Sequence, residues 1–203
     1  MDAKTALMIA LLAAGLWSGV RQWELRPMHP QDGLLAPDDP LQTDVQKAEP
    51  LHHGRWTLTP RATYEITARI LGREDYHFDA LSDLIPEDLA LGWGPMSDNR
   101  FLAGFEISQG GRFYEWRPRD SRPFVREDVS THSANTHVIP VDSVVRRQLA
   151  RLRVGEIVRL TGTLVDAVRD DGAYVRTSLT RTDTGAGACE VMLVERVESP
   201  PLE

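Results

Sequence analysis

The sequence predicts a mainly β protein that carries one N-terminal membrane-spanning helix. This fold class rests on an apolar run near the N-terminus, apolar residues that alternate with polar ones along later segments, and glycine-centred turns between those segments. Of the 203 residues, 41% are hydrophobic and 26% are charged, which is typical of a globular chain. About 140 residues follow position 61, enough for one domain with its own core.

Residues 1–26 are predicted to be a membrane anchor. Residues 5–20 read TALMIALLAAGLWSGV and carry no charge. At about 1.5 Å of rise per residue, a helix of this length nearly spans a bilayer core when Lys4 and Arg21 extend toward the head groups. The lipid bilayer is therefore the first expected partner, bound through this segment.

Two other interpretations of the segment have less support. A cleaved signal peptide would end near Ala13 and Gly15, but Leu16 and Trp17 continue the apolar run beyond them. A buried core helix would show a polar face, which the segment lacks. Basic residues flank it almost equally, so the orientation follows the usual behaviour of N-terminal signal anchors. We expect a single-pass protein of the inner (cytoplasmic) membrane with its C-terminal domain in the periplasm.

Residues 27–61 are predicted to be a proline-rich extended tether. The segment contains six prolines. Proline fixes φ and biases the preceding residue toward extended conformations, so we expect a semi-rigid spacer that reaches roughly 3 Å per residue. His52 and His53 are adjacent in this polar stretch, where solvated histidines are commoner than a metal site.

Residues 62–203 are predicted to form the folded domain. Glycine turns, of which Gly110-Gly111 is the clearest, join neighbouring strands, and Asp142 or Ser143 caps a short amphipathic helix between the third and fourth strands. Strands are expected over residues 64–71, 105–108, 112–116, 156–168, 173–180 and 189–197.

This order of strands and helix resembles the small β-barrel of the oligonucleotide/oligosaccharide-binding (OB) fold. In residues 155–164, GEIVRLTGTL, a mid-strand glycine permits the sharp coiling that a small barrel needs. The resemblance implies an OB-like barrel with long loop insertions at residues 73–101 and 118–140. The whole chain also resembles uncharacterised membrane-anchored proteins of Gram-negative bacteria through the segments LALGWGPMSD, HSANTHVIP and TRTDTGAGACE. Neither resemblance implies an activity, because this fold carries many unrelated functions.

Charge and cysteine content restrict the classes of function. The formal net charge is -7, which argues against nucleic acid as a partner because such proteins neutralise many phosphates with Lys and Arg. Cys189 is the only cysteine, so no disulfide can form within the chain. The sequence has no strong catalytic, metal or nucleotide motif, and no cofactor is expected.

Three polar, glycine-containing loops, at residues 91–100, 132–137 and 180–190, are the predicted location of any site, because long polar loops are commoner at functional sites than in simple connectors. The candidate ligand-binding residues in these loops are Trp93, Asp98, Arg100, His132, Asn135, His137, Arg181 and Asp183.

A metal-dependent hydrolase built on His132, His137, Asp98 and Asp183 is one alternative function. The two histidines are five residues apart, which matches no established zinc pattern, and hydrogen bonds to loop backbone are the simpler role for them. Cys189 with His132 or His137 as base is another arrangement with catalytic residue types. In the run CEVMLV, however, Cys189 alternates onto the same strand face as the apolar residues, which favours a small buried hydrophobe.

The leading hypothesis is a non-enzymatic accessory or scaffold domain, held at the membrane, that binds another protein of the cell envelope. The anchor, the tether and the absence of catalytic spacing support it. A glycan-binding or oligonucleotide-binding barrel is a further alternative. It would use Phe113, Tyr114 and Trp116 as stacking surfaces, although neighbours on a strand face opposite sides.

Overall fold

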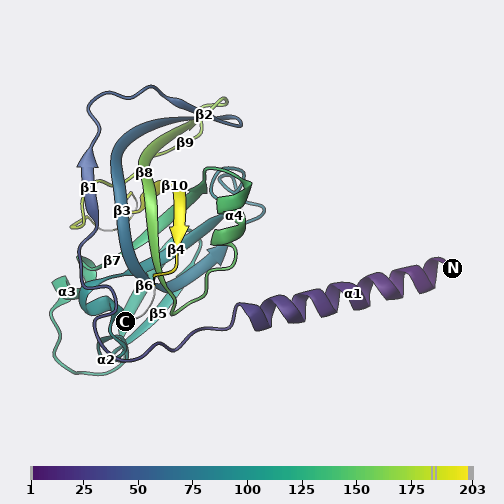
Figure 1. Cartoon of the computed structure of the whole chain (residues 1–203), viewed down its shortest axis with the longest axis horizontal. Helices are drawn as coiled ribbons and strands as arrows, with labels where there is room; N and C mark the ends of the chain where they lie inside the picture. Colours follow the sequence, from purple (N-terminus) through teal and green to yellow (C-terminus); the bar gives the residue numbers. More distant parts are fainter. Residues whose placement is uncertain (1, 184, 186, 201–203) are drawn as a thin grey trace.

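The structure is a computed structural model that describes residues 2–183, 185 and 187–200. It is mainly β sheet and carries one apolar N-terminal helix, which extends away from the rest of the chain (Figure 1). The helix, α1, spans Ala3–Glu24, and the Asp2 side chain accepts a hydrogen bond from Thr5 N at 2.8 Å as its N-cap. None of its residues is buried, and it is long and apolar enough to cross a membrane.

Five strands form a closed circuit of hydrogen-bonded pairs. β3 (Trp56–Asp75) pairs with β4 (Glu87–Gly92), β4 with β7 (Ser133–Pro140), β7 with β10 (Glu190–Glu198), β10 with β8 (Ile157–Arg169), and β8 again with β3. The β7–β10 pair is parallel and the other four pairs are antiparallel.

Three short strands extend this sheet. β1 (Leu41–Asp44) and β2 (Leu51–His53) both pair with β3, and β9 (Tyr174–Val175) pairs with β8. The sequence predicted a longer strand at residues 173–180, but after β9 the backbone N–H groups of Thr177 and Val191 bond to the side chains of Asp166 and Thr177.

The main core lies inside the circuit of strands, and the short helix α4 (Ser143–Leu149) packs against it. The predicted cap is confirmed, because Asp142 Oδ1 accepts hydrogen bonds from Val144 N and Val145 N at 2.7 and 2.8 Å. Val145 and Leu149 enter the core from this helix. Gly162, in the middle of β8, lies so close to β10 that a Cβ atom there would overlap the carbonyl oxygen of Leu193.

The predicted hairpin is confirmed as β5 (Phe105–Gly110) and β6 (Phe113–Pro118), but it forms a separate two-stranded sheet. Its inner face packs on the outside of β3 and β4 through an apolar cluster with several edge-to-face aromatic contacts. The connections around it contain the short helices η1 (Gly94–Ser97), α2 (Asn99–Leu102) and α3 (Arg126–Ser130).

The second and third strands of the circuit are therefore β4 and β7, and both lie within the segments expected to be loop insertions. The prediction of loop insertions was wrong because strands were identified by the alternation of polar and apolar residues. Every residue of β4 is buried and six of the eight residues of β7 are buried, so neither strand has a solvent-facing side that would produce a polar–apolar pattern.

The segment expected to be an extended tether, residues 27–61, lies along the domain. Met28 N donates to Val154 O at 2.7 Å, Ala36 N donates to Ser97 Oγ at 3.1 Å, and the chain then enters β1, β2 and β3. These bonds satisfy backbone groups that a free spacer would leave to water. Only Arg26 and Pro27 separate the C-cap of α1, Leu25, from Met28, which makes the first backbone hydrogen bond to the domain.

Candidate functional site

A group of buried polar side chains lies on the outer face of β4, β7 and β10, beneath the tip of the β5–β6 hairpin. Asp88 on β4 is paired with His137 on β7, and the parallel register places Val191 of β10 beside His137. Residues paired across neighbouring strands share a face, and so do residues two apart on one strand. Asn135, His137, Asp88 and Cys189 therefore lie on one side of the sheet.

Within this group, a carboxylate, an imidazole and a thiol lie on the same face of the sheet. His137 Nδ1 lies 2.8 Å from Asp88 Oδ1. Asn135 Nδ2 donates to Cys189 Sγ at 3.5 Å. The Asp88 side chain is fully buried and that of His137 is 9% exposed, whereas Cys189 is half-buried.

The electrostatics of the site favour a charged imidazole. Desolvation opposes the charge on His137, but the hydrogen bond and the negative charge of Asp88, together with the interaction with Cys189, outweigh it and raise the pKa of His137 to about 9. At neutral pH the ring is therefore an imidazolium, and Nδ1 donates its proton to the Asp88 carboxylate.

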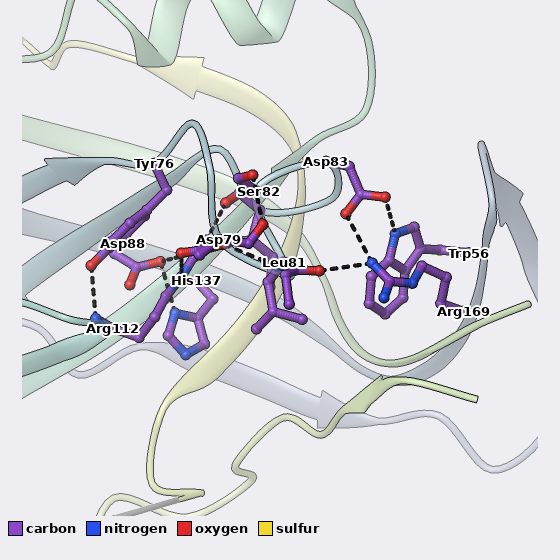
Figure 2. Close-up of polar contacts among 12 residues, drawn as sticks. Trp56, Tyr76, Asp79, Leu81, Ser82, Asp83, Asp88, Arg112, His137 and Arg169 are labelled. Atoms are coloured by element: carbon purple, nitrogen blue, oxygen red, sulfur yellow. Dashed lines mark hydrogen bonds and ion pairs between the residues drawn. The ribbon is translucent and has the colours of Figure 1, made fainter. Parts of the chain in front are cut away.

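Arg112, at the tip of the hairpin, holds the other side of the site (Figure 2). Its guanidinium lies 3.1 Å from Asp88 Oδ1, and two of its nitrogens donate to the Asp79 carboxylate at 2.9 and 2.8 Å. The group also stacks on the Tyr76 ring, 3.7 Å from its centroid. Hydrogen bonding to Arg112 lowers the pKa of Asp79. Figure 2 shows Asp88 between the guanidinium of Arg112 and the imidazole of His137.

Asn135 connects the hairpin to the thiol. Its Nδ2 also donates to Arg112 O at 3.1 Å, and its Oδ1 accepts from Gln109 Nε2 at 2.8 Å. The amide is therefore held on both sides by the hairpin.

A cavity of about 320 Å³ opens beside Cys189. Its walls include three aromatic residues of β6, namely Phe113, Tyr114 and Trp116. The polar residues Asn135 and Asp183 also line it. A small molecule in this cavity would meet aromatic surface and the half-buried sulfur together.

The structure brings together three of the eight predicted site residues and separates the others. Asn135 and His137 belong to the polar group, and Asp183 lines the same cavity. Asp183 accepts a hydrogen bond from Ser178 Oγ at 2.7 Å. Arg181 instead donates to Pro40 O at 2.8 Å.

The four remaining candidates lie around η1 and α2 and hold the N-terminal segment and the loops in place. The buried Trp93 donates its indole N–H to Asp39 at 3.0 Å, and the His132 ring lies beside it with Nδ1 3.0 Å from Asp128 O. Asp98 caps α2, accepting from Arg100 N at 2.8 Å, and it also accepts from Gly33 N at 3.3 Å. Arg100 pairs with Asp32 on the surface.

The described part of the chain contains no group of three or more His, Cys, Asp or Glu residues placed to hold a metal ion. His132 and His137 lie at opposite ends of a strand segment and have different partners, a backbone carbonyl and Asp88. The sequence favoured hydrogen bonds to loop backbone for both histidines. His132 does bond to a backbone carbonyl, that of Asp128 in α3, but the prediction is wrong for His137, which bonds to the side chain of Asp88.

Sequence reasoning missed Asp88 and Arg112 and assigned Cys189 to the core. The face of Cys189 was predicted correctly, because Val191 and Leu193 on that face are buried in an apolar cluster. Cys189, however, lies at the edge of this cluster, where the cavity begins. The sequence did contain a signal for Asp88, because this carboxylate stands at the start of the largely apolar run EDLALG. Acidic residues are rarely buried unless they are paired, so a buried strand here would require a partner for Asp88.

No family model, no curated protein and no solved structure matches this chain.

Proposed function

We propose that this chain is a single-pass inner-membrane protein with an OB-like barrel on the periplasmic side. In this proposal the domain is a non-enzymatic accessory or scaffold that binds another protein of the cell envelope.

The strand circuit supports the OB-like assignment. In chain order the five strands are β3, β4, β7, β8 and β10, and their spatial order runs first, second, third, fifth, fourth and back to the first. The first and fourth strands of the chain close the circuit, the third and fifth are parallel, and α4 connects the third to the fourth. A small Greek-key barrel with a helix at this point is the arrangement of the OB fold.

The connection between α1 and the domain supports a domain held close to the bilayer. Arg21 near the end of α1 forms an ion pair with Asp75 at 3.5 Å, and Met28 is already bonded to the domain. A membrane-spanning α1 would therefore place the domain at the membrane surface.

The observation that supports protein binding is an exposed row of side chains near β2 and β9. These strands lie at the end of the domain remote from α1 (Figure 1). There β2, the start of β3, the end of β8 and β9 form a four-strand ribbon, and the strand pairings align one outward-facing row of residues. Tyr174 and Val168 in this row are 67% and 50% exposed. The row consists of His52, Thr57, Val168 and Tyr174.

Two physical properties suit this ribbon to protein contact. Tyrosine is enriched at protein interfaces because it combines apolar area with a polar tip. Short strands at a sheet edge also present unpaired backbone groups to a partner strand. We name this surface, defined by the row and the edges of β2 and β9, the distal ribbon.

Photo-crosslinking in native membranes tests the proposal. A photoreactive phenylalanine analogue replaces Tyr174 in the full-length chain, and the same analogue replaces the exposed Asp120 as a matched control. We expect a discrete protein adduct from position 174 and none from position 120. Absence of an adduct at position 174, or identical adducts at both positions, would contradict binding through the distal ribbon.

The alternative functions have less support from the geometry. The four residues of the hydrolase alternative have separate partners, as described above. For a glycan or single-strand binder, Tyr114 and Trp116 pack against the apolar cluster beneath the hairpin as well as lining the cavity beside Cys189, so Phe113 is the large exposed aromatic of β6.

A further inference from the structure

A cavity of about 770 Å³ lies between the last turns of α1 and the segment around α4. We propose that it binds the anionic head group of a membrane phospholipid, such as phosphatidylglycerol, through the guanidinium groups of Arg147 and Arg151. The inference rests on one part of the proposed function, the membrane-spanning α1. It is independent of protein binding through the distal ribbon, because that surface and the cavity are formed by different residues.

One wall of the cavity is basic, although the chain as a whole is acidic. Residues 143–153, which include α4, contain four arginines and no acidic residue, whereas the formal net charge of the chain is -7. Three of these arginines, at positions 147, 151 and 153, line the cavity. Arg147 and Arg151 are four residues apart, and backbone hydrogen bonds continue the turn past the end of α4 to Arg151. The two side chains therefore project from the same side of this segment.

These two guanidinium groups are available to a ligand. Both residues are exposed, and neither forms an ion pair or a side-chain hydrogen bond with any other residue that the structure describes. The other arginines of the cavity already have partners, because Arg21 pairs with Asp75 at 3.5 Å and Arg153 donates to the sulfur of Met28 at 2.9 Å. A guanidinium group suits a phosphodiester, because its planar set of N–H donors matches two oxygens of the phosphate.

Two carboxylates also line the cavity, and the balance of charge selects among phospholipids. Both oxygens of Glu156 are hydrogen-bonded, to Arg153 N and to Ser199 Oγ at 3.0 Å each, whereas Glu24 is exposed. Four arginines against two glutamates leave a formal charge of +2 on the residues that line the cavity. A head group with net negative charge neutralises this excess, whereas the ammonium group of phosphatidylethanolamine would add to it.

The position of the cavity along α1 matches the level of phospholipid head groups. From Lys4 to Arg21 a helix rises about 26 Å, close to the roughly 30 Å of a bilayer core. With Lys4 at one surface, Arg21 therefore lies near the other, and Trp17 lies near the membrane–water interface, where tryptophan is enriched. The apolar side chains of Trp17, Val20 and Leu25 in the cavity wall would contact the glycerol and the first methylene groups of the lipid.

The same geometry turns α4 toward the bilayer. Figure 1 shows α4 on the side of the domain toward which α1 extends. When α1 spans the membrane, Arg147 and Arg151 therefore face the surface from which α1 emerges. Basic residues held near a surface that contains anionic lipids are attracted to it.

Native mass spectrometry of the full-length chain in detergent tests the proposal. Phosphatidylglycerol or phosphatidylethanolamine is titrated into the protein, and the bound fraction gives an apparent dissociation constant for each lipid. Wild type is compared with the double variant Arg147→Gln, Arg151→Gln. The matched control is Arg117→Gln, Arg122→Gln, which also removes two charges, from side chains that are 75% and 61% exposed on or beside the β5–β6 hairpin.

We expect wild type to bind phosphatidylglycerol about tenfold more tightly than phosphatidylethanolamine. The Arg147→Gln, Arg151→Gln variant should lose about tenfold in affinity for phosphatidylglycerol, whereas the control should stay within about twofold of wild type. Equal affinity of wild type for the two lipids, or equal losses in the two double variants, would overturn the proposal. If a variant fails to fold, as judged by circular dichroism, the comparison of the two lipids on wild type still decides.

Inorganic phosphate distinguishes a lipid site from a general anion site. Millimolar inorganic phosphate should leave phosphatidylglycerol bound, because free phosphate lacks the acyl chains and glycerol that the apolar wall contacts. Displacement of the lipid by inorganic phosphate would overturn the assignment to a phospholipid.

Carbonate extraction of native membranes separates this inference from the proposed function. A chain that resists extraction but shows no preference for phosphatidylglycerol overturns lipid binding in the cavity alone. A chain that carbonate releases overturns the membrane anchor, and the lipid site with it.

Discussion

Arg112 has a positive φ of 71°, a value that nonglycine residues seldom adopt. It follows Gly111, which also has a positive φ, so the two residues make the kind of tight turn that suits the twist of a hairpin. The left-handed conformation costs roughly 1 kcal/mol for a residue with a side chain. The ion pairs with Asp79 and Asp88 offset this cost and fasten the hairpin tip to the sheet.

At this scale we predict that Arg112→Met lowers the free energy of unfolding by about 3 kcal/mol, because it removes a cation from the fully buried carboxylate of Asp88. The matched change Arg117→Met, on the same hairpin, removes an ion pair whose side chains are 75% and 60% exposed. It should change stability by less than about 1 kcal/mol. Urea unfolding of the two variants measures both effects. Equal losses would show that the buried pair adds no more to stability than the exposed pair.

At the scale of elements, β8 lies very close to β10 at Gly162. Gly162 pairs with Tyr64 of β3 and with Val194 of β10, and a side chain there would collide with backbone that cannot move freely. We predict that Gly162→Ala destabilises the domain by about 2 kcal/mol or more. Gly110→Ala in β5, where no heavy atom lies within 4 Å of the added carbon, is the control and should be nearly neutral. Thermal unfolding compares them, and equal midpoints would contradict this account of strand packing.

At the scale of the whole molecule, the buried side chains of Glu87, Glu190 and His137 all make the free energy of unfolding fall as the pH rises. Desolvation raises the pKa of Glu87 to about 8, although Arg73 lies 3.1 Å away, and it also raises the pKa of Glu190 to about 8. His137 is raised to about 9 by Asp88 and Cys189 despite its own desolvation. Each group therefore binds its proton more tightly in the folded than in the unfolded chain.

The stabilisation from these protons is fully present below the unfolded pKa values, about 4.5 for Glu and about 6.5 for His, and it is lost as pH rises through the folded values. We predict that the thermal midpoint falls between about pH 5 and about pH 9, as measured by circular dichroism. The double variant Glu87→Gln, Glu190→Gln should show a flatter profile. If the thermal midpoint of the wild type rises from about pH 5 to about pH 9, the pKa values of these three groups are not raised by folding.

Local features of the structure could be predicted from the sequence. The apolar α1, the cap of α4 by Asp142 and the Gly110-Gly111 hairpin each depend on residues a few positions apart, so their physical causes lie within a short stretch of chain. The general role of Gly162 was also accessible, because a glycine inside a strand indicates close approach of backbone.

What the sequence determined by itself is therefore a mainly β chain with one apolar N-terminal helix and the face on which Cys189 lies. Only the tertiary structure decided that β4 and β7 are central strands, that residues after Pro27 lie against the domain, and that Asp88 pairs with His137. The physical reason is that these features depend on contacts between residues far apart in the sequence. Burial on both faces removes the alternating pattern from a strand, and the register between strands, which no local spacing encodes, sets which distant side chains share a face.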